Sequence, residues 1–310
     1  MQLTPRLAVM LATPPLMWAG NAVIGRIAID SIGPLWLNAL RWVVALALLL
    51  PLGWSAVASA AAWRRIGERW RYLAVLGVIG IGGYNALQYM ALRTSTPLNV
   101  TLIASSSPVW SLVIGALVYR VKPTRMQMLG AALSLTGVAT VLSRGDLATL
   151  LGIHFVQGDL LILIAIIGWS YYSWLLARPP AHMQGEARPA WGWAEFLIAQ
   201  SVYGVPSALM VALIGDAVAP PSPAVWSPLL VGIILFVAIG PSVIAYRLWG
   251  LAVAEAGPQM AAIFYNLTPL FAAVLSAALI GEWPRIFHGV AFALIVAGIS
   301  VASRAPSLQG

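Results

Sequence analysis

Apolar runs long enough to cross a lipid bilayer recur along the whole 310-residue chain, and this pattern most constrains the fold. A hydrocarbon core of about 30 Å is crossed by an α-helix of roughly 20 residues. Only 8% of the residues are charged, whereas a soluble domain typically has about a quarter. We therefore predict an all-α, polytopic protein that forms one membrane domain over residues 1–310, without a soluble appendage.

The apolar runs and the turn residues between them predict ten transmembrane helices. The expected ranges are 7–27, 33–53, 71–92, 98–119, 125–142, 157–177, 194–214, 227–250, 258–280 and 285–303. The first run follows a basic residue, as in a signal peptide. No small-residue cleavage site closes this run, so we expect a retained helix.

Arginine and lysine are distributed unevenly between the two sides of these spans. With the N-terminus inside, eleven basic residues fall in cytoplasmic segments and five in outer ones, Arg247 being left out because it lies within a span. The positive-inside rule therefore predicts that both termini are cytoplasmic, in a bacterial inner membrane. The basic residues behind the net charge of +8 lie mainly in these cytoplasmic segments. They do not form a patch interleaved with aromatic residues, so a nucleic-acid partner is not expected.

The second half of the chain repeats the breaker residues of the first half at an offset of 161 positions. Four pairs coincide without a gap: Pro97 with Pro258, Pro108 with Pro269, Pro123 with Pro284, and Gly137 with Gly298. Earlier in the halves the match is weaker, with Trp18 corresponding to Trp169. We predict two five-helix repeats, residues 1–147 and 152–310, which are inverted because each has an odd number of spans. Inverted repeats are typical of secondary transporters.

Segments 104–144 and 265–304, each centred on a proline, resemble the drug/metabolite transporter superfamily, specifically its EamA-type ten-helix exporters. The pattern that carries the resemblance is Pro269, Gly281-Glu282, Pro284, Gly289 and Gly298. The first repeat departs from this pattern, with Arg120-Val121 in place of Gly281-Glu282. The resemblance implies export of amino acids and related metabolites. Aromatic amino-acid exporters form one branch of this superfamily.

Pro108 and Pro269 fall near the middle of their spans, and each follows a group of polar residues. A proline removes a backbone donor and frees the carbonyl one turn earlier. Matching defects in the two repeats predict a substrate site near the bilayer midplane. A simple kink whose freed groups bond to neighbouring Ser or Thr is the alternative.

Polar and aromatic side chains on single helix faces are the candidates for the cavity wall. We expect ten substrate-binding residues, Trp18, Asn21, Tyr84, Asn85, Gln88, Ser105, Trp169, Tyr172, Tyr246 and Asn266, with Pro108 and Pro269 as helix kinks. The amides could equally form hydrogen bonds between helices. We assign five tryptophans to the interfacial belt: Trp174, Trp191, Trp193, Trp226 and Trp249.

Charged groups inside the spans bear on the mechanism. No Asp or Glu lies at the centre of any span, so strong proton or sodium coupling is not indicated. Arg41 and Arg247 lie deepest, and Arg247 could either meet a substrate carboxylate or extend to the membrane surface. The glycine-rich run 77–83 is explained by close helix packing.

These features favour a carrier that exports or facilitates the passage of small metabolites, most of all amino acids, by alternating access. A channel-like facilitator is the main alternative. An intramembrane enzyme is disfavoured because the three histidines are scattered. A primary pump is disfavoured because the chain has no phosphate-binding loop. With no cysteine present, no thiolate metal site is possible, and neither a metal nor another cofactor is expected. The expected partners are a small-molecule substrate and membrane lipid.

Overall fold

The computed structural model describes residues 3–28, 31–146, 148–152, 154–218, 224–280 and 285–304. These residues form helices and connecting turns without a β-strand. Within them, ten helical segments are long and apolar enough to cross a membrane, which agrees with the ten spans expected from the sequence. Residues 219–223, which lie between the seventh and eighth expected spans, and the Gly281-Glu282 and Pro284 motif lie outside the described residues.

Five spans belong to the first half of the chain. They are α1 (Pro5–Ala28), α2 (Pro34–Gly53), α4–η2–α5 (Trp70–Leu76, Gly77–Gly83 and Tyr84–Ala91), α6–α7 (Pro97–Ala104 and Ser107–Leu117) and α8 (Arg125–Leu142). A short 3-10 turn, η1 (Trp54–Ala56), and α3 (Ala60–Glu68) connect the second span to the third. The brief helix α9 (Ala148–Leu151) leads into the second half.

The second half supplies the other five spans. They are α10 (Gln157–Ala177), α11 (Trp193–Val218), α12–η5–α13 (Pro228–Val237, Ala238–Ile244 and Ala245–Ala256), α14–α15 (Pro258–Tyr265 and Thr268–Ile280) and α16 (Ile286–Ser303). Two 3-10 turns, η3 (Ala181–Met183) and η4 (Gly185–Ala187), lie in the loop between α10 and α11.

Four of the spans are interrupted, and the interruptions occur in matching pairs. The third and eighth spans each contain a seven-residue π-helical segment, η2 and η5. The fourth and ninth spans are each divided by a two-residue turn, at Ser105–Ser106 and at Asn266–Leu267. Pro108 and Pro269 each occupy the second position of the following helix, α7 or α15, where a missing N–H is tolerated.

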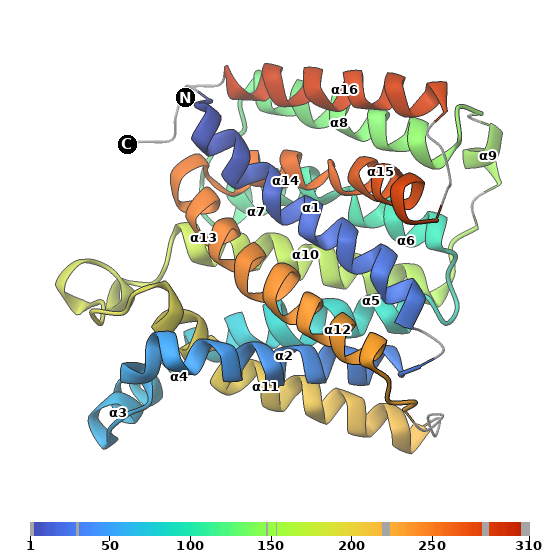
Figure 1. Ribbon diagram of the computed structural model, residues 1–310. Coiled ribbons are helices and arrows are strands. Elements are labelled where there is room, and N and C mark those ends of the chain that lie inside the picture. The colour runs from blue at the N-terminus through green and yellow to red at the C-terminus, as the bar shows by residue number, and fades with distance from the viewer. Residues whose placement is uncertain are drawn as a thin grey trace.

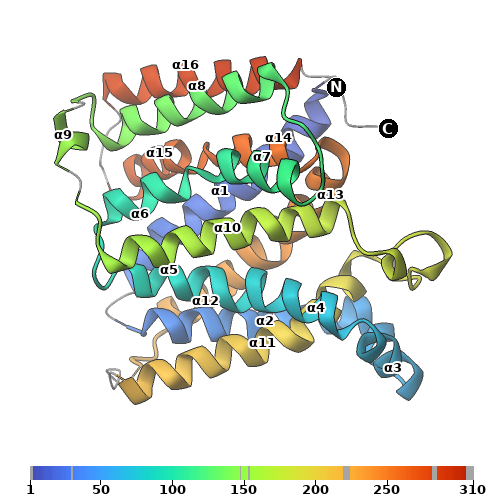
Figure 2. The same ribbon diagram turned by 180° about the vertical axis from the view of Figure 1, so that it is seen from behind.

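The spans lie side by side with their axes roughly along the bundle, as Figure 1 shows, and Figure 2 shows the same order from behind. The start of α1, the end of α16, α3 and the loop that follows α10 gather at one end, on the left in Figure 1, whereas α9 lies at the other end. The helix α10 is central and contacts α5, α6, α7 and α13. This bundle places the ends of α1, α5 and α6 around a common space.

The helices α8 and α16 pack against each other along one side of the bundle (Figure 1). A Cβ at Gly130 would lie 2.6 Å from the carbonyl oxygen of Gly298, and one at Gly137 would lie 2.9 Å from that of Ala291. Adding 161 to Gly130 and Gly137 gives Ala291 and Gly298, so each of these contacts is the counterpart of the other. Reciprocal contacts of this kind are compatible with two inverted repeats.

Candidate functional site

A cavity of about 670 Å³ lies among α1, α2, α5, α6, α10, α13, α14 and α15. It reaches the exposed residues Leu92 and Arg93, which directly follow α5 (Figure 1), and this end of the cavity lies opposite the start of α1. Its lining residue closest to the N-terminus of α1 is Trp18, so the cavity is bounded partway along the bundle. A volume of this size suits a single small molecule, since ligand pockets measure about 300–1,000 Å³.

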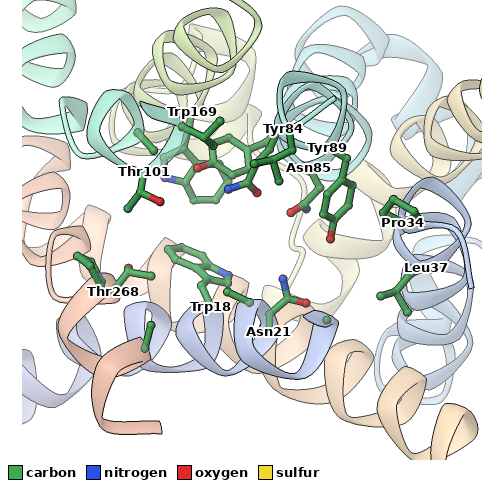
Figure 3. Close-up of a pocket in the computed structure, with 18 of the residues that line it drawn as sticks. Trp18, Asn21, Pro34, Leu37, Tyr84, Asn85, Tyr89, Thr101, Trp169 and Thr268 are labelled. Carbon is green, nitrogen blue, oxygen red and sulfur yellow. The ribbon is translucent and has the colours of Figure 1, made fainter. Parts of the chain in front are cut away.

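Eight of the ten expected substrate-binding residues lie on the cavity wall: Trp18, Asn21, Tyr84, Asn85, Gln88, Ser105, Trp169 and Tyr246. Figure 3 shows Trp18 and Asn21 of α1 facing Tyr84, Asn85 and Tyr89 across the open space. On each of α1 and α5, these residues lie on a single helix face, and the two faces form opposite walls of one cavity. The wall also includes Pro269, at the start of α15.

An aromatic cluster closes the inner end of the cavity. The ring of Trp18 lies 5.2 Å from that of Trp169 at an interplanar angle of 87°, and 5.8 Å from that of Tyr265. The hydroxyls of Tyr84 and Tyr265 are 2.7 Å apart and bridge α5 to α14. Edge-to-face aromatic pairs add stability beyond the area they bury. This cluster forms a packed barrier below the open part of the cavity.

Two residues of the aromatic cluster bond to backbone carbonyls in the π-helical segments. Trp18 donates its indole N–H to the carbonyl of Pro241 at 3.2 Å, and Tyr246 donates its hydroxyl to the carbonyl of Gly80. Gly80 and Pro241 are 161 positions apart and lie at the same place in η2 and η5. In a membrane, carbonyls that leave the regular helix pattern need such partners. The π segments therefore fix the orientation of two side chains on the cavity wall.

Tyr172 and Asn266 are not among the described lining residues. Tyr172 stacks on Trp169 at 5.0 Å and donates a hydrogen bond to Gln200 at 3.2 Å, so it supports the wall from behind. Asn266 donates to Ser134 of α8 at 2.9 Å. Pro108 is buried outside the cavity, in contrast to its counterpart Pro269.

The assignment of Trp174 and Trp249 to the interfacial belt is wrong. Each side chain is only 1% exposed. The ring of Trp249 lies 5.2 Å from that of Trp18 and belongs to the aromatic cluster. The eighth span extends to Ala256 instead of ending near residue 250, which places Trp249 inside the bundle. Trp174 donates its N–H to the carbonyl of Ser111 at 2.8 Å.

The most informative residue that the expected site omits is Arg41, which lines the cavity from α2 although it is only 2% exposed. It donates one hydrogen bond, to Asn21 at 3.3 Å. The sequence could have indicated Arg41 by its position seven residues into the span, because a cation at that depth is rare without a function. Arg247, in contrast, is exposed, lies over the ring of Trp193 at 4.5 Å and is not among the described lining residues.

Tyr89 and Tyr265 also line the cavity and were not among the expected residues. Tyr89 is four residues from Asn85 on α5, and Tyr265 immediately precedes the turn of the ninth span. Among the described residues, no group of three His, Cys, Asp or Glu side chains is placed to hold a metal ion. The described lining holds two arginines and no carboxylate.

Comparisons with known proteins agree with this architecture. An uncharacterized transporter of Archaeoglobus fulgidus is 26% identical over 295 residues, which cover 94% of each chain. The uncharacterized transporter YyaM of Bacillus subtilis is 27% identical over 232 residues, covering 74% of this chain and 72% of that one. A solved crystal structure with 20% identity covers 96% of each chain with a TM-score of 0.72, which shows a shared fold. The EamA-like transporter family matches residues 6–143 and 156–304, and the chain belongs to this family.

Proposed function

We propose that the protein is a secondary carrier that exports small metabolites, most of all amino acids including aromatic ones, by alternating access. The observation that carries the proposal is a cavity of about 670 Å³ that is open toward one end of the bundle and bounded by aromatic rings partway along it. Membership of a transporter family supports the same function. A cavity wall of indole and phenol rings suits a substrate with an apolar or aromatic body.

We further propose that the protein lies in a bacterial inner membrane with both termini in the cytoplasm. The helix α3, which carries Arg64 and Arg65, and the loop that follows α10 lie at the same end of the bundle as the start of α1 and the end of α16 (Figure 1). The positive-inside rule places such an end in the cytoplasm. The cavity would then open to the outside.

Counterflow in proteoliposomes tests the carrier. Vesicles are loaded with an unlabelled amino acid, and uptake of the same labelled amino acid is followed from a dilute outer solution. A carrier concentrates the label transiently because exchange is faster than net loss, whereas a channel lets both gradients decay. Transient accumulation in a screen of amino acids, absent from protein-free vesicles, is the expected result; downhill flux without accumulation would indicate a channel.

A matched pair of tryptophan variants links the flux to the cavity. Trp18→Ala removes a ring from the cavity wall, whereas Trp226→Ala removes a ring that is 63% exposed and not among the described lining residues. We expect counterflow to fall at least tenfold in Trp18→Ala and to stay near the wild-type rate in Trp226→Ala. Equal rates in the two variants, with equal amounts of inserted protein, would place the transport path elsewhere.

A further inference from the structure

Arg41 is a buried cation on the cavity wall whose charge has no carboxylate partner among the described residues. The ion pairs found there join Glu68 to Arg64 and to Arg69, at the far end of the bundle. The Arg41 guanidinium has five N–H donors, and within the described part of the chain one of them is used, in the bond to the neutral amide of Asn21. Its Nε is buried without an acceptor.

The depth of Arg41 makes this arrangement costly. The residue lies seven positions after Pro34, the first residue of α2, which corresponds to about 10 Å along the helix. A charged side chain inside a membrane segment is unfavourable unless it pairs or faces a water-filled space. Arg41 lines the cavity, so its unused donors can be completed by a molecule that enters from the open end.

The rest of the cavity narrows the chemistry of that molecule. Arg93, the other arginine on the wall, lies at the exposed mouth, and no carboxylate is present among the described lining residues. Asn21 bonds to Arg41, and elsewhere the described wall carries neutral amides and aromatic rings, including Asn85 and Trp18. Such a site favours an anionic head group beside an apolar body. The planar guanidinium matches a carboxylate in particular, because the two can form parallel hydrogen bonds.

We propose that Arg41 is the specificity-determining residue of the cavity and binds the carboxylate of an organic-acid or amino-acid substrate, whose apolar part lies against Trp18 and Trp169. This inference rests on the proposed carrier function, since it names the substrate class of the same cavity. Organic acids and amino acids of this class share a carboxylate on a small apolar body. Simple carboxylates and zwitterionic amino acids are distinguished by the probes below.

Binding to the purified full chain in detergent tests the proposal without requiring transport. The probes are 3-phenylpropionate, its neutral isostere 3-phenylpropanamide, and phenylalanine, followed by quenching of intrinsic tryptophan fluorescence. A hydrogen-bonded charge pair predicts that the wild type binds the acid about 10- to 100-fold more tightly than the amide. Tighter binding of phenylalanine than of 3-phenylpropionate would identify an amino-acid site, and the reverse order would identify a simple carboxylate site.

Three variants assign the preference to Arg41. Arg41→Gln should remove the acid-over-amide ratio, and Arg41→Lys should keep part of it, because the charge remains and the forked geometry is lost. Arg247→Gln makes the same charge change at an exposed site outside the described lining and should keep the full ratio. An unchanged ratio in Arg41→Gln would overturn the proposal. If that variant does not fold, equal binding of acid and amide by the wild type would overturn it instead.

Counterflow separates this inference from the carrier itself. Exchange of neutral or cationic solutes, combined with no carboxylate preference in the binding assay, would keep the carrier and overturn the role of Arg41. An Arg41-dependent carboxylate preference without counterflow of any probe would support the binding site and overturn the carrier.

Discussion

The two halves of the chain share a backbone plan but present different side chains to the cavity. Adding 161 to the bounds of η2, Gly77–Gly83, gives those of η5, Ala238–Ile244. The same offset relates α6, α8 and the start of α7 to α14, α16 and the start of α15. The positions where helices begin, break and change to π geometry have therefore been kept in both halves.

The side chains at equivalent backbone positions differ between the two halves. In the third span, Asn85 and Gln88 line the cavity, and their counterparts in the eighth span are Tyr246 and Trp249. At the same offset, Arg41 of α2 corresponds to Val202 in α11. The first half thus supplies most of the polar wall, and the second half much of the aromatic barrier. The two halves therefore combine a similar backbone with different side chains on the cavity wall.

The predicted inversion of the two halves gives the largest expected effect, which is all-or-none. Alkaline phosphatase, active only outside the cytoplasm, should be active when fused after Asp146, behind five spans, and silent when fused to the C-terminus, behind ten. Green fluorescent protein should give the opposite pattern. Equal phosphatase activity at both positions would mean that the two halves enter the membrane with the same orientation.

Replacing glycine by a larger residue in the α8–α16 contact tests whether the two halves contribute equivalent contacts. Gly137→Leu and Gly298→Leu should each lower the free energy of unfolding by about 3 kcal/mol, because the new side chain meets a backbone oxygen of the partner helix. The measurement is unfolding of the purified protein in mixed micelles. Gly289→Leu is the control, since nothing lies within 4 Å of a Cβ there. A large loss at only one of the two equivalent glycines would contradict a reciprocal interface.

Much of this plan is predictable because proline and glycine act on the backbone locally. Pro108 and Pro269 occur at matching positions in the two halves, and they mark the turns in the fourth and ninth spans. The π segments were not predicted, because the glycines of 77–83 also fit close packing, and that packing is present where Gly77 meets the backbone of Gln200. Choosing between two helical hydrogen-bond patterns depends on partners such as the Tyr246 hydroxyl, which is 166 residues away from Gly80.

The cavity wall was predictable where helix faces carry several polar residues, as at Asn85 and Gln88 on α5. It was not predictable where the tertiary arrangement decides exposure. Arg41 and Arg247 have the same charge and similar apolar neighbours in sequence, yet only Arg41 is enclosed beside Asn21. Trp249 was misplaced because the length of the eighth span depends on packing beyond residue 250.

The next largest effect is expected at the two equivalent carbonyls of the π segments. Tyr246→Phe and Trp18→Phe each remove the donor to one of two equivalent carbonyls, those of Gly80 and Pro241. Leaving a carbonyl unpaired should lower the unfolding free energy by about 2 kcal/mol in each variant. Tyr203→Phe is a suitable control, because no side-chain hydrogen bond of Tyr203 is found among the described residues. Unequal losses would show that the two π segments are held differently.

The smallest effect is expected at the prolines that begin α7 and α15. An alanine at position 108 or 269 restores an N–H that could bond to the carbonyl of Ala104 or Tyr265, four residues earlier, and so favours a continuous helix. Packing around the turns opposes this change, so we expect the conformational equilibrium to shift only about threefold, equivalent to ~0.6 kcal/mol. If the halves are inverted, as the sequence predicts, Pro108→Ala and Pro269→Ala should shift it in opposite directions.

A single cysteine at the lining residue Ala22 can report this shift, since the chain contains no cysteine of its own. A membrane-impermeant maleimide added at the open end of the cavity should label Ala22→Cys faster in one proline variant and slower in the other than in the wild-type background. Glycine in place of alanine at 108 and 269 also restores the N–H but favours the helix less, and should give smaller shifts of the same sign. Shifts in the same direction for both prolines would contradict equivalent pivots in inverted halves, and unchanged rates would mean that packing alone maintains the two turns.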